Sequence, residues 1–477
     1  MWPFNAIKNR ASKVTKVIRA IYDAAQTTSD NRKHWANADA LSADAACSSS
    51  VRKTVRERAR YEYANNSYVC GMVQTLTNDI IGTGPRLQMK TKDPLLNAAV
   101  EREYAKWCKR SKFNKKLRVM RNAKTVDGET FGILTTNEKL RSRVKLDVNV
   151  VEADRVANPY FDFKNNKIID GIEFDEYGNP SIYHVMKSHP GDMFATMESM
   201  KVPSENMIHW FSPSRPEQHR GVSEIVSTLP LFSQMRRYTL AVVSAAENLA
   251  NIAIGLKTNA PPDGEASDEY ESMDAFELPR NMVTVLPSGW DLTQADPVQP
   301  TTTYPQFKSE ILKEVGRCKS MPKNIMTCDS SGYNYASGRL DHQTYFKAIA
   351  VERSDAELEV TDVVFEAFCA ELMLSTEFAA LRTMDEIQHQ WFYDGREHVD
   401  PLKEAQAQDI NLENNSTTLA FEYGKRGLDW ETEVEQRIKE KAKIADLHKK
   451  YKLTETPKKP VEVKDEPEES ESITNEN

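Results

Sequence analysis

The sequence predicts an α+β protein that turns mostly helical in its second half. In the first 215 residues, segments with helical spacing of apolar side chains alternate with short β-type runs. A small β module then lies between two helices, residues 230–251 and 304–319. A polar loop and a helix of more than thirty residues follow. This order predicts a mixed domain joined to a helical hairpin and a long connecting helix.

The N-terminal segment, residues 1–26, has the pattern of a basic amphipathic helix. Ile7, Val14, Ile18 and Ile21 share one side of it, and lysines and arginines occupy the other. We interpret it as an arm that packs on this protein or on a neighbouring subunit, with binding to a membrane surface as the alternative.

Helices and strands alternate through the first domain. Residues 51–81 predict one helix that ends at Gly82-Thr83-Gly84-Pro85, a glycine cap followed by proline. The next helices are predicted at residues 94–107 and 113–126. β-type runs, including a hairpin at 168–185, occupy residues 85–90, 128–134, 144–151, 168–185 and 207–211.

The β module between the two helices is predicted from three short β-type runs. These runs are residues 252–256, 281–286 and 290–292, and a loop rich in proline, glycine and acidic residues separates the first two. The helix before the module carries Arg236 and Arg237.

The segment around which the chain is organised is a polar loop between two helices. Residues 327–338 interrupt helical periodicity with serine, asparagine and glycine, and the long helix is expected to begin between 337 and 340 and to reach about 374. Its first apolar stripe is Leu340, Phe346, Ile349 and Ala350, and its second is Val360, Val364, Ala367, Phe368 and Leu372. The stretch between them, residues 352–359, is mostly charged, and a helix of this length rarely stays straight.

The C-terminal part predicts three shorter helices, at residues 402–408, 416–423 and 430–447. From residue 454 onward aromatic residues vanish and glutamate, proline and serine dominate, which predicts a disordered tail.

Composition limits the possible functions. The chain has 477 residues and a formal net charge of −8, which argues against tight non-specific DNA binding through phosphate neutralisation but not against a DNA conduit. Six cysteines without a CxxC pair, and histidines without a metal-ligand spacing, predict reduced thiols in a cytoplasmic compartment and neither zinc nor another cofactor. We expect no membrane segment, because no apolar run approaches the ~18–20 residues that a spanning helix needs.

Catalytic motifs are absent from the sequence. It contains neither GxxxxGK[ST] nor GxSxG, so we expect no ATPase activity. Asp147, Glu152 and Asp154 surround a predicted strand and leave a metal-dependent nuclease open as an alternative. Near the central loop, Tyr333 and Tyr335 could stack on a ligand, and Lys323 and Arg339 supply positive charge.

Six segments, in this order, make the chain similar to the lambda-like family of tailed-phage portal proteins. They are RERARYEYANNSYVCGMVQTLTNDIIGTGPRLQ (56–88), DVNVVEADRVANP (147–159), GIEFDEYGNPSIYHVMKSHPGD (171–192), VPSENMIHWFSPSRPEQHRG (202–221), the stretch 304–339 with Met321-Pro322 and SGYNYAS, and VDPLKEAQ (399–406).

This resemblance implies a portal-type α+β fold in a ring-forming oligomer, usually of twelve subunits. It divides the chain into an N-terminal arm (1–50), an α/β wing (51–220), a helical stem (221–251 and 304–322), a small β-containing clip (252–303), a tunnel loop (323–339), a long wing helix (340–390), a helical crown (391–450) and a tail (451–477).

The resemblance also implies a non-enzymatic function. The ring would occupy one vertex of the virion capsid after assembly in the host cytoplasm, and would pass double-stranded DNA without sequence preference. Its partners would be the terminase large subunit, a head–tail adaptor, and the major capsid and scaffold proteins. A different capsid-associated structural or scaffold protein remains an alternative.

The candidate channel residues belong to the tunnel loop and the stem. The tunnel-loop candidates are Lys323, Ser330, Ser331, Tyr333, Asn334, Tyr335, Ser337 and Arg339. The stem candidates are Arg236 and Arg237.

Overall fold

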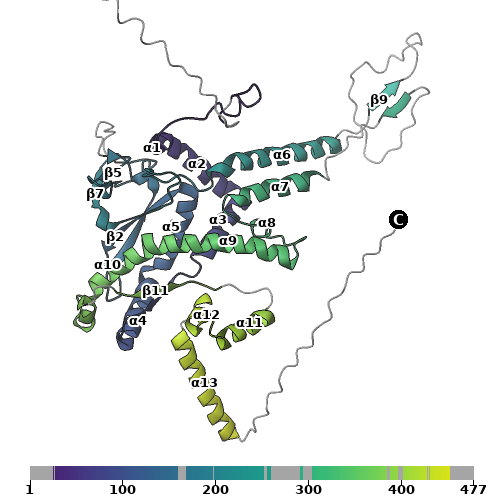
Figure 1. Ribbon diagram of the computed structural model, residues 1–477. Coiled ribbons are helices and arrows are strands. Elements are labelled where there is room, and N and C mark those ends of the chain that lie inside the picture. Colours follow the sequence, from purple (N-terminus) through teal and green to yellow (C-terminus); the bar gives the residue numbers. More distant parts are fainter. Residues whose placement is uncertain are drawn as a thin grey trace, which may run out of the picture.

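The computed structural model describes residues 25, 27–158, 168–196, 198–251, 255–258, 290–293, 303–383, 387–395, 401–426, 428 and 430–451. The predicted N-terminal helix, the 281–286 run and nearly all of the acidic tail therefore lie outside the described residues. Within them, helices and antiparallel sheets form one body from which a helical hairpin and a C-terminal helix project (Figure 1), which confirms the predicted α+β class.

Five helices open the described chain: α1 (Ala43–Ala46), α2 (Ser49–Asn65), α3 (Ser67–Ile80), α4 (Pro94–Ser111) and α5 (Phe113–Asp127). The prediction of a single helix over residues 51–81 is wrong, because the chain breaks at Asn66. Its backbone is extended (φ −124°, ψ 113°), and its side-chain oxygen accepts a hydrogen bond from the Tyr68 amide at 3.1 Å. Asn66 thus acts as an N-cap that starts a second helix.

Two antiparallel sheets form the β part of the body. The three-stranded sheet has the order β3 (Leu146–Val151), β2 (Glu129–Thr136), β8 (Met207–Phe211). The four-stranded sheet runs in sequence order through β4 (Ile168–Ile169), β5 (Ile172–Phe174), β6 (Pro180–Met186) and β7 (Ser199–Pro203). The short 3₁₀ helices Ala153–Arg155 and Ser204–Asn206 contact β2, whereas a third, Val226–Thr228, leads directly into the next helix of the chain.

The three-stranded sheet separates two cores. On β2, Phe131 and Ile133 pack with Tyr183 and Val185 of the four-stranded sheet. The opposite face contributes side chains such as Trp210 to a larger core that includes residues of α3, α4, α5 and α10 (Asp362–Leu372). Alternate residues of a strand point to opposite faces, so both sides of this sheet are covered.

A short sheet joins parts of the chain that are 300 residues apart. β1 (Arg86–Met89) pairs antiparallel with β11 (His389–Phe392), with Leu87 opposite Trp391. β1 was predicted from its alternating pattern, whereas its partner β11 was not.

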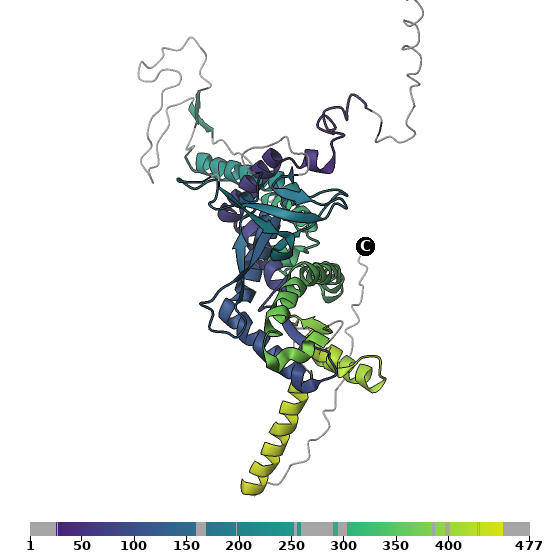
Figure 2. The ribbon, with the colours of Figure 1, turned by 90° about the vertical axis from the view of Figure 1, so that its left-hand side faces the viewer.

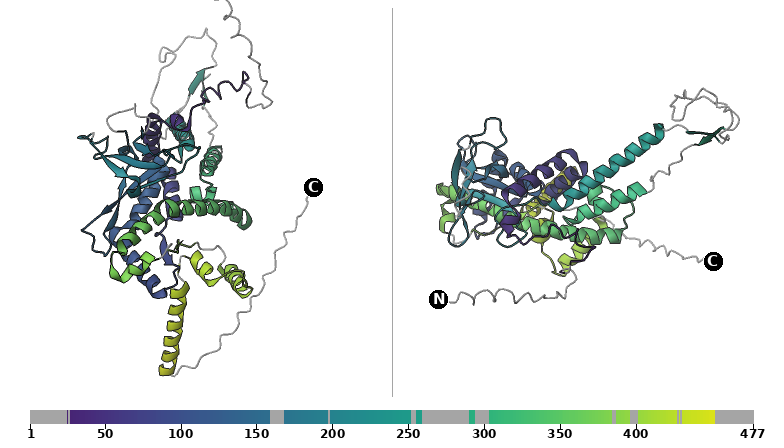
Figure 3. Two further views of the ribbon diagram at one scale, coloured as in Figure 1. Left: turned by 60° about the vertical axis from the view of Figure 1, so that its left-hand side comes forward. Right: turned by 90° about the horizontal axis from the view of Figure 1, so that it is seen from above.

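A helical hairpin, α6 (Leu229–Asn251) and α7 (Thr303–Arg317), projects from the body (Figures 1 and 3). Among the described residues at its tip, β9 (Gly255–Thr258) pairs antiparallel with β10 (Trp290–Thr293). Tyr238 of α6 stacks on Tyr304 of α7 with ring centroids 5.8 Å apart. The predicted order of helix, β module and helix is therefore confirmed.

The predicted long helix is interrupted by a π-helical turn. α9 (Tyr335–Ala356) leads into the π-helix Glu357–Thr361 and then into α10 (Asp362–Leu372), which the 3₁₀ helix Thr376–Thr383 follows. The π turn lies at the end of the charged stretch where a straight helix was not expected. The second predicted apolar stripe, which begins at Val360, is covered by the rest of the protein. In the first stripe Leu340 is 65% exposed, and Tyr345, which was not part of the predicted stripe, is buried instead.

The C-terminal helices are α11 (Pro401–Glu413), α12 (Leu419–Lys425) and α13 (Trp430–Tyr451). Figure 2 shows α13 extending away from the body, and none of its residues is buried. No helix in the described part of the chain combines the length and the apolar character that crossing a membrane requires.

Candidate functional site

The loop between α7 and α9 is shorter than the sequence predicted. Pro322 has an extended backbone and precedes the short helix α8 (Lys323–Thr327). Cys328 and Gly332 then have positive φ angles of 53° and 78°. The Asn334 side chain accepts a hydrogen bond from the Ser337 amide at 2.8 Å and starts α9. Of residues 323–339, only 328–334 are therefore loop, because the residues at both ends of this stretch belong to α8 and α9.

The predicted tunnel-loop residues consequently lie in three different settings. Lys323 begins α8 and is half-buried, whereas Tyr335, Ser337 and Arg339 belong to the first turns of α9 and not to a loop. Residues of the loop itself are exposed except for half-buried Tyr333; the exposed candidates are Ser330, Ser331 and Asn334.

The loop carries negative as well as positive charge. Hydrogen bonds from the Ser331 side chain and backbone hold the pKa of Asp329 below its usual value, and Lys323 adds to the effect. Asp341 is exposed two residues after Arg339. The two cations identified from the sequence are thus accompanied by two carboxylates, so this segment is not a strongly basic surface.

A side-chain contact across the loop was not predicted. The Asn324 amide and the His342 ring lie 2.9 Å apart, which joins α8 to the second turn of α9. Neither residue shows a pattern in the sequence that would identify the pair, because the contact depends on how the two helices meet.

The predicted stem arginines also differ in their surroundings. Arg236 lies over the Tyr61 ring, 5.6 Å from its centroid, and donates to the Asn65 carbonyl oxygen at 3.2 Å. Arg237 is exposed. Arg236 therefore fastens the base of α6 to α2, while Arg237 faces outward.

A groove of about 1,820 Å³ lies beside the loop. Tyr333, Arg339 and Phe346 line one side, and Trp391 of β11 and Trp430 of α13 line another. The segment that carries the predicted site thus opens onto a wide aromatic groove.

A buried ion network fixes α2 to the three-stranded sheet. Glu129 is fully buried and accepts hydrogen bonds from Arg220 (Nη2 at 2.7 Å), the Gly221 amide (2.9 Å) and Arg56 (3.3 Å). His209 contributes a fourth contact at 3.2 Å. Burial opposes ionisation of Glu129, but Arg220 and His209 outweigh it and hold its pKa well below the usual value. Burial also lowers the pKa of His209, so its ring is neutral at pH 7 and donates to the carboxylate.

The segments that carried the family resemblance meet at this network. Arg56 comes from the RERAR segment, Asp154 from VVEADR, His209 from IHWF and Arg220 from the HRG segment. Arg56 Nη1 lies 2.5 Å from Asp154 Oδ1. These separate motifs are therefore parts of one tertiary feature.

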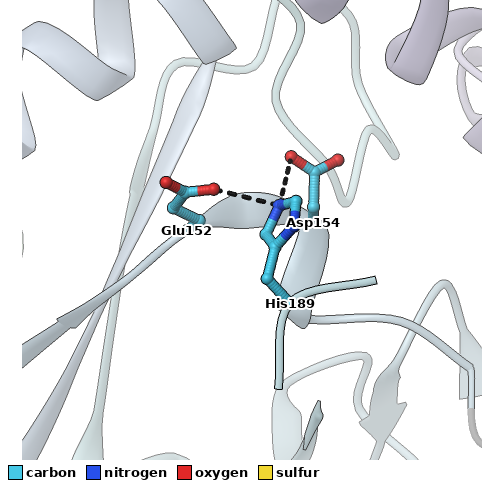
Figure 4. A group of neighbouring side chains, drawn as sticks. All are labelled: Glu152, Asp154 and His189. Atoms are coloured by element: carbon cyan, nitrogen blue, oxygen red, sulfur yellow. Dashed lines mark ion pairs between the residues drawn. The ribbon is translucent and has the colours of Figure 1, made fainter. Parts of the chain in front are cut away.

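Glu152, Asp154 and His189 form a group with the residue types of a metal site (Figure 4). His189 Nε2 lies 3.0 Å from Glu152 and 3.5 Å from Asp154. However, Arg60 Nη1 lies 2.8 Å from the same Asp154 oxygen that faces His189. Burial raises the pKa of Asp154, but Arg56 and Arg60 outweigh it and lower the pKa overall.

The charge balance of this group therefore disfavours a divalent cation, because arginine already compensates the carboxylates. The nuclease alternative also required Asp147, which instead pairs with Lys116 and accepts from Asn137 Nδ2 at 2.9 Å. The described residues thus do not assemble the predicted three-carboxylate site.

Comparisons with known proteins give one consistent picture. The model of the phage portal protein, lambda family, matches residues 29–353. The probable portal protein of Halomonas phage phiHAP-1 is 24% identical over 408 residues, covering 79% of this chain and 78% of the relative.

Among solved structures, similar chains occur in gene transfer agent particles and in a phage portal protein. A chain of the native gene transfer agent virion matches 78% of this chain and 92% of its own length, with a TM-score of 0.42 and 12% identity. An HK97 family phage portal protein from Corynebacterium diphtheriae matches 60% of this chain and 85% of its own length, with a TM-score of 0.27 and 12% identity. The family match alone spans more than half of the sequence, and we conclude that this chain belongs to the lambda family of phage portal proteins, structural components of phage particles.

Proposed function

We propose that about twelve copies of this chain form a ring at one vertex of the capsid, around a channel for double-stranded DNA. The observation that carries this proposal is the exposed apolar surface of the α6–α7 hairpin. Leu240 and Val243 of α6 are 61% and 47% exposed, and Phe307 of α7 is 41% exposed. From Thr239 to Ala250, α6 is apolar or small on nearly all sides and has one charged residue, Glu247.

A helix that is apolar all round is normally buried. In this chain α6 has one helical neighbour, α7, along its projecting part. Copies arranged by a rotation would cover each hairpin with the next one, and a head-to-tail contact of this kind closes into a ring. This need for a covering subunit supports the oligomer.

The parts of the chain would then have the following positions. Residues 51–220 form the wing and 340–390 its long helix; residues 221–251 and 304–322 form the stem. Residues 252–303 form the clip, 323–339 the tunnel loop and 391–450 the crown inside the capsid. The arm (1–50) and the tail (451–477) precede and follow these parts in the sequence.

At the tunnel loop we assign the contact with DNA phosphates to Lys323 and Arg339. Asp329 and Asp341 beside them keep this contact weak, as sliding DNA requires. The exposed serines and Asn334 offer further polar contacts without sequence preference, and Tyr333 and Tyr335 lie beside them. At the stem, exposed Arg237 is the better placed of the two arginines to meet DNA, since Arg236 is engaged with α2.

The ring would act as a docking platform and not as an enzyme. The clip would meet the terminase large subunit, whose ATPase supplies the energy for packaging, because this chain has no nucleotide-binding motif. A head–tail adaptor would bind after packaging, and major capsid and scaffold proteins would surround the ring during assembly in the host cytoplasm.

Electron microscopy of the purified chain, with its mass measured by light scattering, tests the ring. We expect a closed ring of about 650 kDa for twelve chains of 54.2 kDa. Replacing Leu240 and Val243 with glutamate should leave folded monomers. The matched control Leu95→Glu alters an apolar side chain that is 84% exposed on α4 and should leave the ring intact. Rings of normal size from the Leu240→Glu/Val243→Glu variant would refute the assigned interface.

The tunnel-loop assignment needs a separate test. Lys323→Ala together with Arg339→Ala should change genome packaging or retention in particles that still contain a normal ring. If both remain unchanged, these two residues do not contact DNA.

A further inference from the structure

A second groove, of about 680 Å³, lies on the wing, between the start of α5 and the end of the β2–β3 hairpin. We call it the lysine groove because Lys112, Lys115, Lys116 and Lys139 line it. Lys112, Lys115 and Lys139 are exposed, and of the four only Lys116 has an ion-pair partner among the described residues, Asp147.

Positive charge is concentrated around this groove although the chain as a whole is acidic. Residues 109–118 and 139–145 contain ten lysines and arginines and no carboxylate, and two carboxylates, Glu138 and Asp147, also line the groove. In a protein with a net charge of −8, a surface of this kind marks a site for an anionic partner.

The shape of the groove favours an extended peptide over a DNA duplex. Val119, which is 49% exposed, and half-buried Val150 provide an apolar floor. β3 is an edge strand of its sheet, and edge strands accept an added extended segment. A duplex carries one charge per about 1.7 Å of axis and needs cations spread along a surface, whereas these lysines converge on a concavity of ligand-pocket size.

The acidic C-terminal segment of this chain has the complementary chemistry. Residues 461–464 read Val-Glu-Val-Lys, with the two valines alternating as in a strand, and residues 465–471 contain five carboxylates and no lysine or arginine. The valines match the apolar floor, and the carboxylates that follow match the lysines.

We propose that the lysine groove binds residues 461–471 of this chain, from the same copy or from a neighbouring one. The bound segment neutralises the lysines and covers the edge of β3. The groove is then occupied by the chain's own tail, and a nucleic acid or a foreign acidic peptide must displace the tail to bind there. This proposal does not depend on the ring or on the DNA channel.

Fluorescence anisotropy with a labelled peptide of residues 461–477 tests the groove. The protein in this assay is the full chain with Asp465, Glu466, Glu468 and Glu469 changed to glutamine, so that its own tail no longer competes with the peptide for the groove. We expect saturable binding that weakens with added salt. The rim variant Lys112→Glu/Lys115→Glu/Lys139→Glu should bind at least tenfold more weakly.

A matched control separates the site from net charge. Lys53→Glu/Lys347→Glu/Lys441→Glu changes three exposed lysines elsewhere by the same total charge and should bind the peptide as the parent does. A peptide with its five carboxylates at 465–471 replaced by lysine should regain binding to the rim variant. Equal losses in the rim and control variants, or no restoration by the reversed peptide, would overturn the proposal.

Carbodiimide crosslinking of the unmodified full chain tests occupancy by the tail itself. We expect amide links between the rim lysines and carboxylates of 465–471, identified by mass spectrometry. Mixing isotope-labelled and unlabelled chains distinguishes links within one copy from links between copies, and either pattern supports the proposal. Links confined to lysines outside the groove, or a DNA duplex that binds the rim while the tail peptide does not, would refute it.

Discussion

Replacing Glu129 with glutamine should strongly destabilise the part of the body that contains α2 and the three-stranded sheet. Glu129 is the fully buried acceptor for Arg220 and Arg56, which are 2% and 5% exposed. Glutamine has nearly the same shape but no negative charge, and its amide group would point NH₂ donors at groups that are donors themselves. Arg220 would retain its hydrogen bonds to the carbonyl oxygens of Val156 and Ala153, and Arg56 would retain its ion pair with Asp154.

The magnitude follows from the burial of the network. Removing one partner of a buried ion pair costs about 3–5 kcal/mol, because the remaining charge stays in a site of low polarity. Two arginines lose their common partner here, although Asp154 still compensates Arg56. We therefore expect a loss of about 4 kcal/mol in the free energy of unfolding.

Urea unfolding of the unassembled chain measures this loss. Hydrogen exchange of the β2 and β8 amides shows where in the structure it occurs. Glu57→Gln, on the exposed side of α2, is the control and should change stability by less than about 0.5 kcal/mol. The cost should be the same from pH 5 to pH 8, because the depressed pKa of Glu129 keeps it ionised throughout and its contribution is lost only under more acidic conditions. An unfolding free energy for Glu129→Gln equal to that of Glu57→Gln would refute the reasoning.

Three further changes test other parts of the fold. Burial raises the pKa of Glu359 to about 7. The side chain therefore ionises between pH 5 and pH 8, and the free energy of unfolding should fall by about 1 kcal/mol over this range, after allowance for its partial exposure. Urea unfolding at each pH measures this fall, and Glu359→Gln should abolish it. Gly128→Ala should cost about 3 kcal/mol in thermal unfolding, because φ is +92° and a Cβ would overlap the Val222 backbone. Asn324→Ala removes the hydrogen bond to His342 and should speed limited proteolysis within residues 328–334; an unchanged cleavage rate would show that this bond does not restrain the loop.

The sequence predicted those elements whose pattern is local. α4 and α5 begin at the expected residues because their apolar spacing and flanking residues mark the starts, although α4 continues to Ser111, four residues beyond its predicted end. The break at Asn66 was missed because helical periodicity continues across it. β11 was missed for a different reason: it is a strand through its pairing with β1, and nothing near it in sequence indicates that partner.

The candidate site shows the same limit. Composition identified the polar loop and its two cations, but whether Tyr335 and Arg339 lie in a loop or a helix depended on the side-chain cap at Asn334. On α2, periodicity predicted an apolar face, yet Arg52 and Arg56 are buried there. Their carboxylate partners come from distant segments, and burial of an arginine is understandable only once those partners are known.

One buried cluster contains residues from both sides of the α8–α9 loop. Lys124 on α5 lies 2.7 Å from Glu224 and 3.0 Å from Glu352 of α9, and Lys319, two residues beyond α7, lies 2.7 Å from Glu224. Burial disfavours the Glu224 carboxylate, but Arg121 and these lysines outweigh it and keep its pKa well below the usual value.

Separating α7 from α9 at this cluster would leave charges buried without partners, at a cost of several kcal/mol. The end of the α6–α7 hairpin and α9 should therefore move together with α5 as one unit. A displacement of the α6–α7 hairpin would then reach the α8–α9 loop from both sides, through α8 and through α9. The position of the loop is therefore set by α5, which carries Lys124 of this cluster and ends two residues before Glu129.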